Sequence, residues 1–394
     1  MVLHMLQSID PSLPPPDADA RAHSARVRDA IAIAIDEGGG FLPFDRYMQI
    51  ALYGPGLGYY VAGARKFGAG GDFVTAPEMT ALFGTTLGVQ IAAILDATPA
   101  RQIVELGAGS GKLAADLLVM LAARGAPPAR YQIIEVSADL RERQRATLGR
   151  LAASELPQVK WLSEIPATIA GAVVMNEVLD AIPPHVIARR AGVWFERGVT
   201  RRGDQFEWAE RPLQDSRLMR LAAARFPAEG DYLSEINPAA EALVELIGRR
   251  LAAGAMLIID YGFPRAEYYH HERSAGTLIG HYRHRVHTDP FLWPGLSDLT
   301  THVDFTAIAE AGERAGLSVA GFTSQASFLL SCGVLERLRE VGPTESLGYL
   351  REASAVQRLT SPAEMGESFK VLALARGDHS AWPGFAFGDR SHRL

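Results

Sequence analysis

A short apolar run that ends in three alternate glycines constrains the fold of this chain more than any other feature. The run Ile103–Leu106 precedes a helical pattern, and between them lie Gly107, Gly109 and Gly111. Such a strand–loop–helix connection brings bare backbone against a ligand, because a Cβ atom at these glycines would block the approach. The stretch Tyr131–Glu135 predicts a second strand, whose terminal carboxylate can accept both hydroxyls of a ribose. This order predicts a site for a nucleoside-containing cofactor on a doubly wound α/β sheet.

The spacing of the glycines indicates which cofactor is bound. It is Gly-x-Gly-x-Gly, whereas dinucleotide-binding folds use Gly-x-Gly-x-x-Gly and place a pyrophosphate on the helix N-terminus. S-adenosylmethionine has no phosphate, and it needs close backbone at its amino-acid end and an acid at its ribose. We therefore predict S-adenosylmethionine, with S-adenosylhomocysteine as the product. A nicotinamide- or nucleotide-dependent oxidoreductase is the less favoured functional alternative. The structural alternative is that the glycines form a plain tight turn that binds no ligand.

Predicted strands and helices alternate beyond this motif and end in a late strand at 369–374. That succession fits a class I, Rossmann-like, seven-stranded sheet with an added helical and hairpin lobe and long loops. The expected segments are a flexible tail at 1–22, an N-terminal helical segment with a glycine loop at 23–98, a cofactor-binding core at 99–185, an inserted hairpin and helix at 186–236, a continuation of the core at 237–260, a lid-like loop at 261–300, and C-terminal core elements at 301–388.

Composition excludes several classes of function. The net charge of −6 gives no overall attraction to nucleic acid. Cys332 is the single cysteine, and the histidines between 281 and 287 lack a cysteine or carboxylate partner at ligand spacing, so no metal site is expected. No apolar run reaches the ~18 residues of a membrane span. The first twenty residues resemble neither a signal peptide nor a transit peptide. We therefore expect a cytoplasmic protein without stable membrane insertion.

Six motifs occur in an order that points to one family. They are Gly71–Glu78, Glu105–Gly111, Asn176–Pro183, Ile259–Gly262, Asp298–Phe305 and Met365–Leu372. Together they resemble the MidA group, which comprises S-adenosylmethionine-dependent methyltransferases related to the mitochondrial complex I assembly-factor arginine methyltransferase. The resemblance covers roughly residues 40–388. It implies a class I methyltransferase fold, and a protein arginine as the methyl acceptor in a client similar to a complex I subunit.

The predicted cofactor residues extend beyond the glycines and Glu135. Glu105 resembles a carboxylate that lies near the methionine ammonium in methyltransferases, and Asn176 follows a strand beside the expected ligand crevice. The glycine loop that contains Asp72 and leads to Thr75 is expected to close over the methionine end. Thr75 and Glu78 also have the spacing of a capping box, which is the structural alternative.

Glu177 and Asp180 are the predicted catalytic residues. They follow the strand that ends in Asn176, where two carboxylates can orient a guanidinium and balance its charge. The structural alternative is a capping turn before Pro183.

The predicted function is methylation of a protein arginine. An assembly factor that acts mainly by binding its client, or a methyltransferase for small molecules, is the alternative. A homodimer is compatible with these patterns.

Overall fold

The computed structural model describes residues 13–62, 75–151, 158–377 and 382–394. The chain forms two compact units, each assembled from three separate stretches of sequence. The first unit contains Met1–Val74, Pro183–Asn237 and Tyr269–Thr301, and the second contains Thr75–Ile182, Pro238–Tyr268 and His302–Leu394. All residues of the predicted site that the structure describes belong to the second unit.

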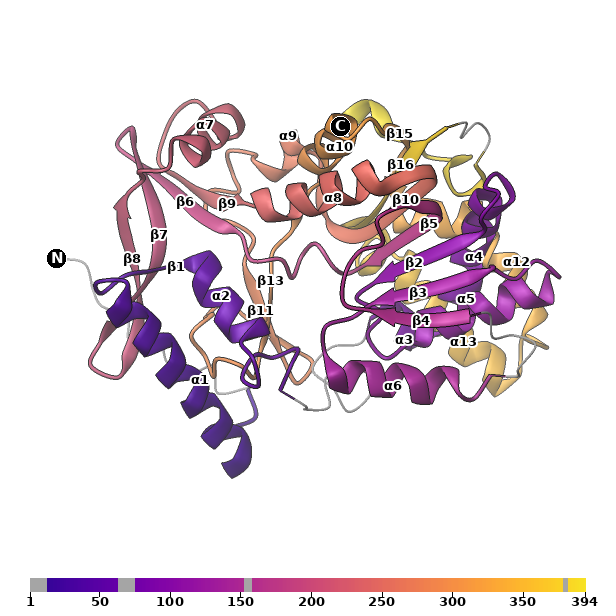
Figure 1. Ribbon diagram of the computed structural model, residues 1–394, viewed down its shortest axis with the longest axis horizontal. Helices are drawn as coiled ribbons and strands as arrows, with labels where there is room; N and C mark the ends of the chain where they lie inside the picture. The colour runs from indigo at the N-terminus through magenta and orange to yellow at the C-terminus, as the bar shows by residue number, and fades with distance from the viewer. Residues whose placement is uncertain (1–12, 63–74, 152–157, 378–381) are drawn as a thin grey trace. The chain divides into compact units, whose positions relative to one another are not determined.

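The second unit is built on the sheet that the sequence predicts. Its strands run in the order β15-β16-β10-β5-β2-β3-β4, and a short strand β14 pairs with β10 (Figure 1). Neighbouring strands from β10 to β4 are parallel, whereas β16 is antiparallel to both β10 and β15. The strands are β2 (Gln102–Leu106), β3 (Arg130–Ile134), β4 (Gln158–Leu162), β5 (Ile169–Asn176), β10 (Leu251–Phe263), β14 (Val303–Asp304), β15 (Ser318–Ser324) and β16 (Phe369–Arg376).

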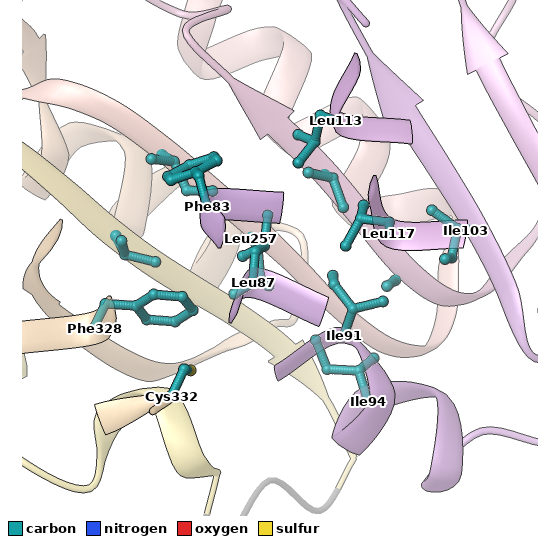
Figure 2. Close-up of a cluster of buried hydrophobic side chains, with 14 of the residues drawn as sticks. Phe83, Leu87, Ile91, Ile94, Ile103, Leu113, Leu117, Leu257, Phe328 and Cys332 are labelled. Atoms are coloured by element: carbon teal, nitrogen blue, oxygen red, sulfur yellow. The ribbon is translucent and has the colours of Figure 1, made fainter. Parts of the chain in front are cut away.

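Helices cover both faces of this sheet, because its central strands are apolar on both sides. Ile103 and Leu257 point to one face, where they contact the helices α4 and α5 (Figure 2). Val104 and Ile258 point to the other face, which α8 and α10 cover. The helices of this unit are α3 (Ala76–Met79), α4 (Ala81–Asp96), α5 (Lys112–Ala123), α6 (Ala138–Leu148), α8 (Pro238–Arg250), α9 (Arg265–Tyr268), α10 (Phe305–Arg314), α11 (Gln325–Ser331), α12 (Val334–Glu340), α13 (Leu347–Thr360), α14 (Met365–Ser368) and the 3₁₀ turns η1 (Pro383–Phe385) and η2 (Ser391–Arg393).

Among its described residues, the first unit contains two antiparallel sheets and three helices. The larger sheet has the order β1-β7-β6-β9, with β8 paired to β7, and the smaller has the order β12-β11-β13. The strands β7 and β8 form an antiparallel hairpin within the segment 186–236, where a hairpin is predicted. The elements are α1 (Ala18–Glu37), α2 (Phe44–Tyr53), α7 (Ser216–Arg225), β1 (Leu42–Pro43), β6 (His185–Arg190), β7 (Val193–Arg202), β8 (Gln205–Pro212), β9 (Tyr232–Ile236), β11 (Ile279–Tyr282), β12 (Arg285–His287) and β13 (Asp298–Thr300).

Two sequence-based expectations about irregular segments are wrong. The tail expected at 1–22 contains the start of α1, because the Asp17 side chain accepts a hydrogen bond from the backbone N–H of Ala20 and caps the helix. Leu13 is also buried, in contact with Tyr282 and Leu292. The loop expected at 261–300 contains three strands, which are too short to show a clear alternation in sequence. Its role as a lid stays a prediction.

Two short breaks divide the helical segments of the second unit. The helix α3 begins after Thr75, and the separate helix α4 begins at Ala81, where the Thr80 hydroxyl accepts the N–H of Leu82 and forms the cap. Gly333, which has a positive φ of 81°, separates α11 from α12. In the part of the chain that the structure describes, we find no helix with the length and apolarity that a bilayer crossing requires.

Candidate active site

The three glycines form a loop in which each has a backbone conformation that favours glycine. Their φ angles are 64° at Gly107, 53° at Gly109 and 82° at Gly111. A Cβ atom at Gly107 would lie 3.0 Å from Val178, and one at Gly111 would lie 3.1 Å from the Cα of Gln144. At Gly109 no heavy atom of the described residues lies within 4 Å of that position. The loop is therefore packed on protein at its two ends and open at its centre, which fits a cofactor that approaches bare backbone.

Glu135 lies just beyond β3 and is held by hydrogen bonds to both carboxylate oxygens. The backbone N–H of Ser137 donates to Oε1 over 2.9 Å, and the side-chain amide of Gln144 donates to Oε2 over 3.0 Å. Burial raises the pKa of this carboxyl, and the two donors oppose that rise. Ser137 also caps α6, as its hydroxyl accepts the N–H of Leu140. Glu135 is thus a fixed acceptor at the end of a strand, which fits the predicted contact with a ribose.

Glu105 is an almost fully buried carboxylate on β2, with 2% of its surface exposed. The Tyr131 hydroxyl donates a hydrogen bond of 2.7 Å to its Oε2 atom. Burial raises the pKa of Glu105 to about 7, the Tyr131 hydrogen bond lowers it, and the charge of Glu135 raises it further. Small changes around this side chain will therefore change its ionisation near neutral pH.

A tight turn follows β5 and carries the predicted catalytic residues. Asn176 pairs with Ile259 of β10, and the next residue, Glu177, has a positive φ of 53°. The side chain of Asp260 fixes the turn, because its Oδ2 atom accepts the backbone N–H groups of Val178, Leu179 and Asp180 over 3.2, 2.9 and 3.3 Å. A non-glycine residue in this region of φ is strained and persists where its surroundings hold it. Asp260 supplies that constraint.

Two acceptor atoms in this turn are buried without a hydrogen-bond partner among the described residues. They are Oδ1 of Asn176 and Oδ1 of Asp180. The amide nitrogen of Asn176 donates to Glu177 over 3.1 Å, which directs its oxygen away from that carboxylate. Burial raises the pKa of Asp180 to about 6, and a hydrogen bond from Tyr261 opposes the rise. Unpaired buried acceptors are costly, so this turn is suited to a ligand that brings N–H donors.

The N-terminal side of the predicted site is only partly described. Asp72 lies outside the described residues. Thr75 precedes α3, but its side chain does not form the predicted capping bond. Glu78 instead accepts a hydrogen bond from the Ser110 hydroxyl and so contacts the glycine loop. It does not complete a capping box. Lys112 forms an ion pair with Asp116 at 2.5 Å.

Three contributors to the site were not among the predicted residues. Gln144 and Tyr131 contact the two predicted cofactor carboxylates, and Asp260 holds the turn that carries Glu177 and Asp180. Asp260 could have been found, because it follows the apolar run Ala255–Ile259 in the sequence as Glu135 follows Tyr131–Ile134. Nothing in the local sequence around Gln144 or Tyr131 indicates a contact with residues that lie elsewhere in the chain.

A separate cluster in the first unit contains a histidine between two carboxylates. His185 Nδ1 lies 3.6 Å from Asp45 Oδ1 and 3.5 Å from Glu196 Oε1. Arg211 donates to the other oxygen of Glu196 over 2.7 Å. Burial lowers the pKa of His185, but its interactions with the two carboxylates outweigh burial and raise it. A protonated His185 together with Arg211 balances both acids, which makes the cluster an ion-pair network.

Comparison with known proteins confirms the fold and the cofactor. A family model described as "Putative S-adenosyl-L-methionine-dependent methyltransferase" matches residues 86–323. A solved structure from Burkholderia thailandensis with bound S-adenosyl-homocysteine is 48% identical, with a TM-score of 0.93, and the match covers 97% of this chain and 100% of that one. A native structure from the same organism is 47% identical, with a TM-score of 0.90. The class I methyltransferase fold and S-adenosylmethionine as cofactor are therefore confirmed.

The names of two relatives concern the methyl acceptor and the cellular location. The mouse protein named "Protein arginine methyltransferase NDUFAF7, mitochondrial" is 30% identical over 370 residues, which cover 83% of this chain and 79% of the mouse protein. The human protein of the same name is 28% identical over 366 residues. Their mitochondrial names contradict the cytoplasmic location expected above. That expectation was wrong because it rested on the absence of signal-peptide, transit-peptide and membrane-span patterns, which does not identify the compartment in which a protein works.

Proposed function

Given that this chain belongs to the S-adenosyl-L-methionine-dependent methyltransferase family whose model it matches, we propose that its methyl acceptor is an arginine side chain of a protein. The observation that carries the proposal is the turn at 176–180. It brings together Asn176 and the carboxylates of Glu177 and Asp180, and two of the acceptor atoms there, Oδ1 of Asn176 and Oδ1 of Asp180, are buried without a partner among the described residues. The names of the mouse and human relatives support the same acceptor.

The chemistry of a guanidinium matches this arrangement. It is planar, carries a full positive charge and has five N–H donors, so it can satisfy several acceptors at once. Asn176 Oδ1, Asp180 Oδ1 and the carboxylate of Glu177 offer acceptors within five consecutive residues. A neutral hydroxyl has one donor, and a carboxylate substrate would be repelled by the two acids. A cationic acceptor rich in N–H groups is therefore favoured.

The transfer itself is a displacement at carbon. S-adenosylmethionine supplies an electrophilic methyl group on a sulfonium, and the electron pair of the broken C–S bond stays on sulfur. In the proposed reaction a nitrogen of the acceptor forms the new C–N bond. Glu177 and Asp180 hold the guanidinium and draw its positive charge away from the attacking nitrogen. That nitrogen becomes acidic as the bond forms, so its proton leaves to a carboxylate or to water without a strong base.

The roles of the two carboxylates can be separated by substitution. Glu177→Gln keeps the shape of the side chain but removes its charge, so we expect methyl transfer to fall by roughly 100-fold or more while cofactor binding changes little. Asp180→Asn should reduce transfer less. Glu142→Gln alters an exposed carboxylate on α6 and is the matched control.

The assay uses an extract from cells that lack this protein, incubated with methyl-labelled S-adenosylmethionine and each variant. Labelled proteins are then digested and analysed by mass spectrometry. Methylated arginine that appears with the wild type and with Glu142→Gln, and is greatly reduced with Glu177→Gln, supports the proposal. Label confined to other residue types or to small molecules contradicts it, and so does a wild-type rate for Glu177→Gln.

A further inference from the structure

We propose that Gln144 is a positioning residue that holds the ribose-binding carboxylate and the glycine loop in one arrangement. The inference rests on the cofactor, which the comparisons confirm, and on the predicted contact between Glu135 and the ribose. It does not depend on which acceptor receives the methyl group. The role proposed for Gln144 therefore stands even if the acceptor is not arginine, and the arginine proposal stands even if Gln144 has no such role.

Gln144 is fully buried on α6, and its side-chain amide makes three hydrogen bonds. The nitrogen Nε2 donates to the backbone carbonyl of Gly109 over 3.0 Å and to Oε2 of Glu135 over 3.0 Å. The oxygen Oε1 accepts the indole N–H of Trp161 over 2.9 Å. One side chain thus joins the open centre of the glycine loop to the acid at the end of β3.

Trp161 determines which way the amide points. An indole nitrogen can only donate, so the oxygen of Gln144 must face Trp161 and its nitrogen must face the two acceptors. The reverse orientation would place the amide oxygen against a carboxylate and a carbonyl. The amide is therefore fixed by its partners, and it in turn fixes the plane of the Glu135 carboxylate together with the N–H of Ser137.

A second side chain of α6 provides a contrast. The Thr147 hydroxyl donates to the backbone carbonyl of Ser110 over 2.8 Å, so Thr147 also holds the glycine loop. In contrast to Gln144, Thr147 makes this hydrogen bond to the loop and not to Glu135. If Gln144 acts through the carboxylate, its loss should weaken recognition of the ribose hydroxyls in particular. Loss of Thr147 should weaken binding of any ligand that uses the loop.

The experiment is a calorimetric titration of the full chain with S-adenosylhomocysteine and with its 2′,3′-dideoxy analogue, which lacks both ribose hydroxyls. For Gln144→Leu we expect affinity for S-adenosylhomocysteine to fall about tenfold or more, because a hydrogen bond to a charged group is lost. Affinity for the dideoxy analogue should fall by a clearly smaller factor, because that ligand is affected only by the lost contact between Gln144 and the glycine loop. Thr147→Val should change both affinities by similar factors, and this variant is the control.

Two outcomes would overturn the proposal. Equal losses for both ligands in Gln144→Leu would show that the residue acts on the loop alone, and unchanged affinities would show that it positions nothing. If Gln144→Leu does not fold, as judged by its thermal transition, Trp161→Phe tests the same chain of contacts. Trp161→Phe removes the N–H donor that orients the Gln144 amide. It should therefore reduce the ratio of the affinity for S-adenosylhomocysteine to the affinity for the dideoxy analogue. An unchanged ratio contradicts the proposal.

Discussion

Replacement of Tyr131 by phenylalanine should move the pH dependence of cofactor binding toward alkaline pH. The Tyr131 hydroxyl donates to Glu105 over 2.7 Å in a fully buried environment. Hydrogen bonds to charged groups contribute about 1.5–3 kcal/mol, and one pKa unit corresponds to about 1.4 kcal/mol. Removal of the donor should therefore raise the pKa of Glu105 by about one to two units. The starting value is already about 7, because burial disfavours the ionised form.

The sign of the effect follows from the predicted role of Glu105 beside the methionine ammonium. Only the ionised carboxylate attracts that ammonium, so the affinity of the wild type should fall as the pH drops through about 7. In Tyr131→Phe the same fall should begin at a higher pH. At pH 7 the variant should bind S-adenosylhomocysteine more weakly than the wild type, and at sufficiently alkaline pH the two affinities should converge.

Isothermal titration with S-adenosylhomocysteine at several pH values tests this reasoning. The control is Tyr47→Phe, which removes a buried tyrosine hydroxyl that donates to the carbonyl of Pro290 in the first unit. The control should leave the pH profile of binding unchanged. Profiles of Tyr131→Phe and wild type that superimpose would refute the link between Glu105 ionisation and cofactor binding.

Three further predictions concern the same unit. Gly109→Val should abolish measurable binding of S-adenosylhomocysteine in calorimetry, because it places a branched side chain at a positive φ in the space that the cofactor needs, and equal affinities would contradict this. Glu135→Ala should weaken binding by ~1.5–3 kcal/mol, and an unchanged affinity would mean that the ribose binds elsewhere. The folded protein raises the pKa of Asp180 from 3.8 to about 6, so stability from this group is present below the unfolded value and is lost as the pH rises through about 6. Asp180→Asn should therefore show a smaller decrease of the thermal midpoint between pH 4 and 6 than the wild type, and parallel curves would argue against this assignment.

The sequence predicts those parts of the site whose geometry depends on a few consecutive residues. The glycines Gly107, Gly109 and Gly111 were selected because a Cβ atom there would block a ligand, and the structure gives all three a positive φ. Glu135 was selected because a carboxylate at the end of an apolar strand is visible within five residues, and its contact with a ribose stays a prediction. The order of apolar strands and helices was also sufficient to predict a seven-stranded sheet with a late final strand, to which the structure adds the short strand β14.

The parts that could not be predicted depend on contacts between distant residues. The side chain of Asp260 holds the N–H of Val178, which lies 82 positions earlier, and no local pattern specifies that pairing. Thr75 has capping-box spacing in the sequence but forms no capping hydrogen bond, whereas the Thr80 hydroxyl, which lacks that spacing, caps α4. The helix α13 was not predicted. The strands within 279–300 were not predicted either, because that segment is rich in histidine and arginine and shows no apolar alternation.

The position of β16 has a consequence for how the protein is made. This strand is the last of its sheet to be synthesised, yet it lies between β10 and β15 and forms hydrogen bonds with both. Until residues 369–376 have left the ribosome, β10 and β15 each present an unpaired edge with apolar side chains. Exposed edges of that kind pair readily with other chains. The nascent chain therefore passes through an interval in which its largest sheet is split in two, and chaperone protection would matter most during that interval.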